Sequence, residues 1–162
     1  LERKKAQNEA ADFKQYQSYK TVLKENSPKS FAEFQDMKYN NPERWGKTMR
    51  NAKLFSKIDG KEQYSPEYKA KLKETYTYFS QNGFEITEHG LNRIVGQKSG
   101  KNKVFFTKEQ LLGVLQKSFN YEQPDGKQVK FYDDIAVIQA RDTGEVVSVV
   151  TRSAVRSDWR KL

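Results

Sequence analysis

The stretch that decides the fold is FEITEHGLNRIVGQ, residues 84–97, which contains the single histidine of the 162-residue chain. Thr87 is a residue type that caps helices, because its hydroxyl accepts a hydrogen bond from a free backbone N–H of the first turn. Ile86, just before the cap, is expected to pack on Leu91 as a hydrophobic staple. These signals predict a short helix that begins after Thr87 and carries His89 in its first turn.

The predicted helix has two chemically different faces. Leu91, Ile94 and Val95 share one face, while His89 and Arg93, four residues apart, share another. A neighbouring guanidinium and the positive end of a helix both favour the neutral form of an imidazole. A neutral imidazole suits general base chemistry near pH 7. We therefore treat His89 as a candidate catalytic residue, with Arg93 beside it.

Upstream of this stretch the sequence predicts only helices. Apolar residues spaced three or four apart, Phe13 among them, indicate an amphipathic helix to about residue 25. Helix-start signals at Ser30, at residues 41–42 and at residues 65–66 predict three more helices. We therefore expect residues 1–75 to form a helical N-terminal segment or linker.

A loop rich in glycine and lysine follows the predicted His89 helix. It contains Lys98, Lys101 and Lys103. Their ammonium groups, together with free backbone N–H groups, are able to contact phosphate. An ordinary solvated loop is the alternative.

Beyond the loop, Thr107 and Gln110 predict a capped helix to about residue 117. The hydrophobic period then changes from helical to alternating, which indicates strands. We expect Trp159, in the tail, to pack back onto the body of the protein. The predicted fold class is α+β, a helical N-terminal segment followed by helices packed on a small four-stranded antiparallel sheet. The predicted domain of residues 76–162 has its strands near residues 119–122, 129–132, 135–140 and 145–153.

Composition limits the kinds of site the chain is able to form. It has no cysteine, a single histidine and no tight carboxylate cluster, so we expect neither a metal site nor a cofactor. No apolar run approaches the roughly 20 residues that a membrane span needs. A net charge of +9 favours polyanionic partners such as RNA, although a solvated lysine-rich surface has the same charge.

Residues 86–94, followed by a Thr-capped helix and strands that end in Val149-Val150-Thr151, resemble the barnase, EndoU, colicin and RelE-like superfamily of metal-independent ribonucleases. Within it, the chain is similar to toxin-like domains at the C-termini of phage minor head proteins of the Mu F type. Residues 30–34 and 38–45 also resemble a linker region of such proteins from Gram-positive hosts. The ribonuclease-like part covers about residues 76–162.

The resemblance implies a phage-borne or polymorphic endoribonuclease toxin that acts on RNA. Such a protein is expected to be associated with the virion, delivered to the bacterial cytoplasm, or both. It also implies an immunity protein as a partner, acidic to match the charge of +9. The first residue is Leu1, which suggests a piece of a longer polypeptide such as a phage head protein.

The resemblance further implies that RNA is cut by its own 2′-hydroxyl group. A base removes the hydroxyl proton, cations and hydroxyl donors stabilise the phosphate, and an acid protonates the leaving 5′-oxygen. His89 matches the base or the acid, and Arg93 or Lys130 the cation. Tyr132, Thr151 or Ser153 match the hydroxyl donors.

Strand positions refine this candidate set. Related toxins often carry Thr on the last strand and a second hydroxyl two positions later, and Thr151 and Ser153 match that spacing, with Ser where Tyr is expected. This departure leaves the identity of the second catalytic group open. Lys130 and Tyr132 lie on the less apolar side of their strand, which favours contact with substrate. Arg152, a further candidate for substrate binding, points to the opposite face from Thr151 in a regular strand.

Each candidate also has a structural interpretation. A lone histidine is more often a packing or surface residue, Arg93 is equally suited to a salt bridge with Asp133 or Asp134, and threonine favours strands in any protein. For the whole chain, the alternatives are a non-catalytic, basic structural or nucleic-acid-binding module of a phage head protein and a nucleic-acid-binding regulator that uses the same sheet.

Overall fold

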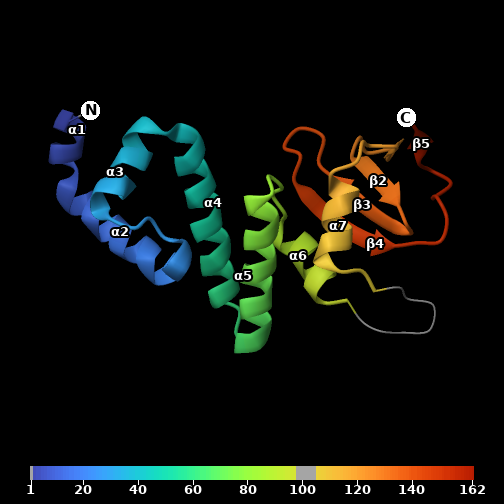
Figure 1. The fold of residues 1–162 in the computed structure, drawn as a ribbon, viewed down its shortest axis with the longest axis horizontal. Helices are drawn as coiled ribbons and strands as arrows, with labels where there is room; N and C mark the ends of the chain where they lie inside the picture. Colours follow the sequence, from blue (N-terminus) through green and yellow to red (C-terminus); the bar gives the residue numbers. More distant parts are fainter. Residues whose placement is uncertain (1, 98–104) are drawn as a thin grey trace. The chain divides into compact units, whose positions relative to one another are not determined.

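A computed structural model describes residues 2–97 and 105–162 (Figure 1). The chain divides into two compact units, Leu1–Tyr64 and Ser65–Leu162, and each is described by itself. The division precedes helix α5 (Pro66–Gln81), whereas the predicted boundary between residues 75 and 76 lies within this helix. The predicted fold class, α+β, is confirmed, because helices make up the first unit and a second unit combines helices with an antiparallel sheet.

Helices are the regular secondary structure of the first unit in its described residues. Ser30 and Asn41 each accept a hydrogen bond from the backbone N–H three residues later, which confirms the predicted starts of two helices. Pro42 begins the helix that Asn41 caps, and it lacks an N–H that would otherwise be unpaired. The elements are α1 (Glu2–Gln7), α2 (Glu9–Leu23), the short 3-10 helix η1 (Lys24–Asn26), α3 (Phe31–Asn40) and α4 (Pro42–Asp59).

A buried carboxylate joins α2 to α3. Asp12 is 1% exposed and accepts hydrogen bonds from Lys38 at 2.7 Å and from Tyr39 at 2.6 Å. Burial disfavours its ionisation, but these hydrogen bonds outweigh burial and hold the pKa of Asp12 below its ordinary value. Phe13, expected in the buried stripe, is 45% exposed instead. One hydrophobic cluster in the core of this unit consists of Tyr16, Phe34 and Met37, with Tyr19, Phe31 and Trp45 packed against it.

In its described residues, the second unit has three helices before the sheet. The capping box of Thr107 and Gln110 forms as predicted, and the hydroxyl of Ser65 accepts a hydrogen bond from the N–H of Tyr68. The helices are α5, α6 (Glu88–Val95) and α7 (Lys108–Leu115). The strands are β1 (Tyr121–Glu122), β2 (Gln128–Tyr132), β3 (Ile135–Gln139), β4 (Val146–Thr151) and β5 (Arg160–Lys161).

The sheet contains five antiparallel strands in the order β4-β3-β2-β1-β5. The prediction of four strands is therefore corrected by β5, which pairs with β1. Trp159, next to β5, is 7% exposed and packs on Val129 and Ala136, which confirms that the tail folds back. Asp133 and Asp134 close the β2–β3 hairpin with φ of 53° and 63°, a left-handed conformation that aspartate tolerates better than most residues.

Cross-strand pairing sorts the residues of the sheet onto two faces. Helix α7 packs on β2 and β3 (Figure 1). We call the side that includes Lys130 the helix-covered face, which consists of Lys130, Tyr132, Ile135, Val137, Val149 and Thr151. We call the opposite side the aromatic face, which consists of Tyr121, Val129, Phe131, Ala136, Ile138 and Val150, with Trp159 packed on it.

None of the helices in the described ranges is long and apolar enough to cross a membrane.

Candidate active site

The start of α6 is fixed against the start of β4. The backbone N–H and the hydroxyl of Thr87 both donate to the carbonyl oxygen of Val146, at 3.0 and 3.2 Å. The same hydroxyl accepts from the N–H of Gly90 at 3.1 Å, as predicted for the helix cap. The N–H of Val146 in turn donates to the carbonyl of Glu85 at 2.8 Å. The helix that carries His89 is thereby attached to the edge strand of the sheet.

Gly90 allows this close approach because it has no side chain. A Cβ atom at this position would lie 2.8 Å from the carbonyl oxygen of Val146 and 2.8 Å from Cγ2 of Ile86. Separations below 3.0 Å are not tolerated without movement, and here one of the two atoms belongs to the backbone. The glycine beside His89 is therefore required by the packing of α6 on β4.

Helix α5 holds α6 from another side. The hydroxyl of Tyr68 donates to Oδ1 of Asn92 at 2.6 Å, and Nδ2 of Asn92 donates to the carbonyl of Glu88 at 3.0 Å. Tyr76 donates to the carboxylate of Glu85 at 2.5 Å, just before the helix begins. These contacts fix the backbone of α6 on both sides of His89.

His89 itself is exposed and lies beside Arg93, as the spacing of four predicts. The Nε–H of Arg93 donates to Nε2 of His89 at 3.5 Å, a long and therefore weak hydrogen bond. In this contact the guanidinium donates and the imidazole nitrogen accepts. The pair combines a proton acceptor with a permanent positive charge on a surface open to solvent.

Lys130 does not face solvent, which corrects the expectation from its strand pattern. The residue is 6% exposed, and its amine donates to the carbonyl of Leu115 at the end of α7, at 2.5 Å. The amine also lies 4.6 Å from the ring centroid of Phe119 and 5.5 Å from that of Phe84. Burial lowers the pKa of Lys130 from its ordinary value. The carbonyl of Leu115 has no partner within α7 because it lies at the helix end, so it provides an acceptor for the buried amine.

Tyr132 and Thr151 lie in one cross-strand row. Both pair with Ile135, so two strand spacings separate them, about 10 Å. The hydroxyl of Tyr132 donates to the carbonyl of Ser118 at 2.7 Å. Ser153 is exposed and lies beyond the end of β4.

The helix that carries His89 begins at the other end of β4 from Thr151. The cap residue Thr87 contacts Val146, the first residue of the strand. Five residue steps of about 3.3 Å separate Val146 from Thr151, about 17 Å in all. Within the described residues, the predicted candidates that the structure brings into contact are therefore His89 and Arg93.

Arg152 points to the aromatic face, as predicted from its position next to Thr151. Its guanidinium carbon lies 5.8 Å from the ring centroid of Trp159, and its Nε–H donates to the carbonyl of Ala154 at 3.1 Å. Asp133, a possible partner of Arg93, lies 4.0 Å from the amine of Lys117 instead. The predicted phosphate-contacting residues Lys98, Lys101 and Lys103 lie outside the described residues.

The aromatic face was not predicted as a functional site. Tyr121 and Phe131 alternate with polar residues in their strands, a signal that predicts strands but not which face of the sheet is open. In the structure both residues are partly exposed. Their ring centroids lie 6.0 and 5.9 Å from that of Trp159. A partly exposed aromatic group beside Arg152 is a type of surface that contacts nucleic-acid bases.

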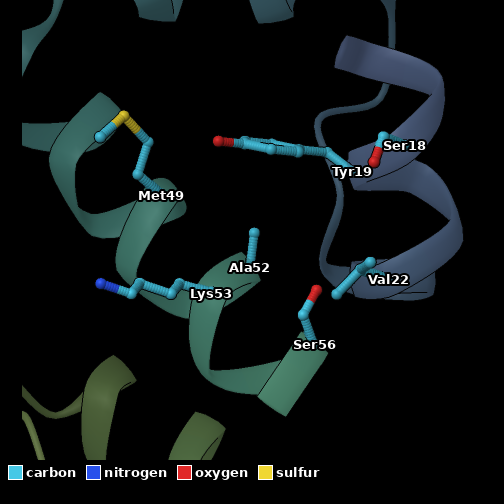
Figure 2. Close-up of a pocket in the computed structure, with 7 residues that line it drawn as sticks. All are labelled: Ser18, Tyr19, Val22, Met49, Ala52, Lys53 and Ser56. Atoms are coloured by element: carbon cyan, nitrogen blue, oxygen red, sulfur yellow. The ribbon is translucent and has the colours of Figure 1, made fainter. Parts of the chain in front are cut away.

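The first unit contains a separate cavity, of about 180 Å³, between α2 and α4. Figure 2 shows the ring of Tyr19 extending from α2 towards Met49 of α4. The lining combines apolar groups with two serines and a lysine, and none of the predicted site residues belongs to it. The lining residues are Ser18, Tyr19, Val22, Met49, Ala52, Lys53 and Ser56.

Residues 2–97 and 105–162 contain no cluster of three or more His, Asp or Glu side chains that could hold a metal ion. Comparisons with known proteins add no assignment. No protein-family model, curated protein or solved structure matches the chain.

Proposed function

We propose that the second unit is an endoribonuclease that cleaves RNA by attack of the 2′-hydroxyl, with His89 as the general acid or base. The observation that carries the proposal is the exposed pair of His89 and Arg93 on a helix anchored to β4. General base catalysis needs an accessible acceptor held in place, and the developing charge on the phosphate needs a nearby cation. The net charge of +9 further favours RNA as the substrate.

In the proposed reaction, the imidazole of His89 accepts the proton of the 2′-hydroxyl once its long contact with Arg93 is given up. The 2′-oxygen forms a bond to phosphorus, and the bond from phosphorus to the 5′-oxygen breaks. The products are a 2′,3′-cyclic phosphate and a 5′-hydroxyl, whose proton comes from a second group or from water. The guanidinium of Arg93 stabilises the crowded phosphate. The burial of Lys130 favours Arg93 over Lys130 as this cation.

The biological setting follows from the sequence resemblance and is proposed on that ground. A ribonuclease of this kind acts as a phage-borne or polymorphic toxin and has an acidic immunity protein as its partner. A non-catalytic, basic module of a phage head protein is the second candidate function. It is favoured by the separation of Thr151 from the start of the His89 helix, because the predicted hydroxyl donors are not gathered around the imidazole.

Incubation of the purified chain with total RNA in the presence of EDTA separates these two functions. Cleavage is expected, and His89→Ala is expected to lower its rate about 100- to 10,000-fold, the usual contribution of a general acid or base. Glu109→Ala is the matched control, since Glu109 is exposed at the equivalent position of α7, which has the same length as α6. Equal cleavage by the unaltered chain and His89→Ala would contradict the proposal, and RNA bound but left intact by both would favour the non-catalytic module.

A further inference from the structure

A second surface of the same unit combines partly exposed aromatic residues with positive charge. Tyr121, Phe131 and Trp159 form a cluster on the aromatic face, with ring centroids 5.9 to 6.4 Å apart. Trp159 is buried, whereas Tyr121 and Phe131 keep part of their surface open to solvent. The buried indole therefore supports the two outer rings and leaves them accessible.

Positive side chains lie at both edges of the aromatic face. Arg152 follows β4 at one edge of the sheet, and Lys161 pairs with Tyr121 in β5 at the other. In the part of the chain that the structure describes, neither has a carboxylate partner. By contrast, Arg156 pairs with Asp158, and Arg160 pairs with Glu122. The two cations next to the rings are thus available to an anionic ligand.

Single-stranded nucleic acid matches this arrangement of charge and rings. Each nucleotide presents a flat base, which stacks on an aromatic side chain, and a phosphate, which attracts a lysine or arginine. A duplex hides the flat faces of its bases inside the stack, and an acidic peptide lacks them. The combination of partly exposed rings with unpaired cations at both edges therefore favours an unpaired strand over either.

We propose that the aromatic face binds single-stranded RNA by stacking bases on Tyr121 and Phe131, with phosphates at Arg152 and Lys161. This inference rests on the proposed function for its choice of RNA, and it adds the requirement that the strand be unpaired. The face is distinct from the pair of His89 and Arg93, which lies on α6. It would hold the strand, while the reaction takes place at the histidine.

Trp159 provides a direct probe of this face. The chain has two tryptophans, and the variant Trp45→Phe leaves Trp159 as the single tryptophan, which is excited selectively over tyrosine. Oligothymidylate of about ten nucleotides is a suitable ligand, because it matches the length that such surfaces bind and has no 2′-hydroxyl to attack. Binding is thereby measured without cleavage. We expect oligothymidylate to change the fluorescence of Trp159 and an abasic strand of equal length and charge to bind far more weakly.

Removal of the two outer rings tests the stacking. In the Trp45→Phe background, Tyr121→Leu with Phe131→Leu is expected to lower the affinity for oligothymidylate at least about 25-fold, because each of the two stacked bases contributes about 5-fold or more. Tyr78→Leu is the matched control, since Tyr78 is also a partly exposed ring with a lysine above it, Lys108 at 4.9 Å, but lies on α5. Circular dichroism verifies that each variant is folded.

Several results would overturn the inference. Equal affinity for the abasic strand, for duplex RNA or for polyglutamate would show a surface that recognises charge alone. Unchanged affinity in the folded ring variant would exclude stacking, and the abasic comparison remains decisive if that variant does not fold. The two proposals are tested independently. If RNA stays intact while Trp159 fluorescence still shows base-dependent binding, the cleavage proposal is wrong and the proposal of a binding face is retained.

Discussion

On the helix-covered face, the amine of Lys130 and the hydroxyl of Tyr132 each donate to a backbone carbonyl at or just beyond the end of α7. On the aromatic face, the guanidinium of Arg152 lies over the ring of Trp159, and the outer rings are partly open. Polar groups on the first face donate to carbonyls at or beyond a helix end, whereas the guanidinium of Arg152 on the second face lies over an indole and has no carboxylate partner among the described residues. Residue type alone does not separate these roles, because the cation on either face contacts an aromatic ring.

Among substitutions that test the difference between the two faces, Trp159→Ala should have the largest effect on stability. The indole covers Val129 and Ala136, both 0% exposed, and its loss is expected to cost about 3 to 5 kcal/mol of unfolding free energy, as is usual for a buried Trp replaced by Ala. Hydrogen exchange at the amides of β2 and β3 measures the loss. Trp159→Phe keeps a ring in place and should therefore lose less unfolding free energy than Trp159→Ala. Unchanged exchange in Trp159→Ala would mean that the tail does not stabilise this face.

A pair of glycine substitutions should change stability in opposite directions. Gly90→Ala introduces a Cβ 2.8 Å from the carbonyl oxygen of Val146 and is expected to destabilise the second unit by about 1 to 3 kcal/mol. Gly113→Ala, in α7, has no atom within 4 Å of the new Cβ and should stabilise the unit by about 1 kcal/mol through helix propensity. Thermal unfolding followed by circular dichroism measures both. Effects of the same sign would disprove the close packing of α6 on β4.

Local signals in the sequence predicted most of the helices. The caps at Thr87 and Thr107 formed as expected, because a capping hydroxyl and its partner N–H lie within one turn of chain. Strand β5 was missed, since a two-residue strand exists only through its partner β1 and has no alternation of its own. The exposure of Phe13 was missed for a related reason, because hydrogen bonds from α3 hold Asp12 in the buried position.

The site was less predictable than the fold. The spacing of four between His89 and Arg93 was enough to predict their contact, since both lie on one helix. The alternation along β2 correctly places Lys130 and Tyr132 on one face and Val129 and Phe131 on the other, but it does not determine which face is open to solvent. Lysine and tyrosine have long apolar stems, so they cross a buried surface and reach polar atoms at its rim. The positions of the carbonyls of Leu115 and Ser118, at and beyond the end of α7, decide where these side chains point, and the pattern of one strand does not contain this tertiary feature.

The smallest effect, a pH dependence, tests the buried state of Lys130 directly. Its pKa is lowered in the folded protein by burial, whereas the unfolded chain has the ordinary value of about 10.4. Between these two values the unfolded chain binds more protons than the folded one, so the free energy of unfolding rises with pH. Below the folded pKa the lysine is charged in both states, and its burial penalty is constant. Lys130→Met lacks the titrating amine, so the stability difference between the unaltered chain and this variant should shift in favour of the unaltered chain as pH approaches 10.4. Urea unfolding across that range measures the difference, and a flat difference would place the amine in solvent, on the substrate side that its strand pattern first indicated.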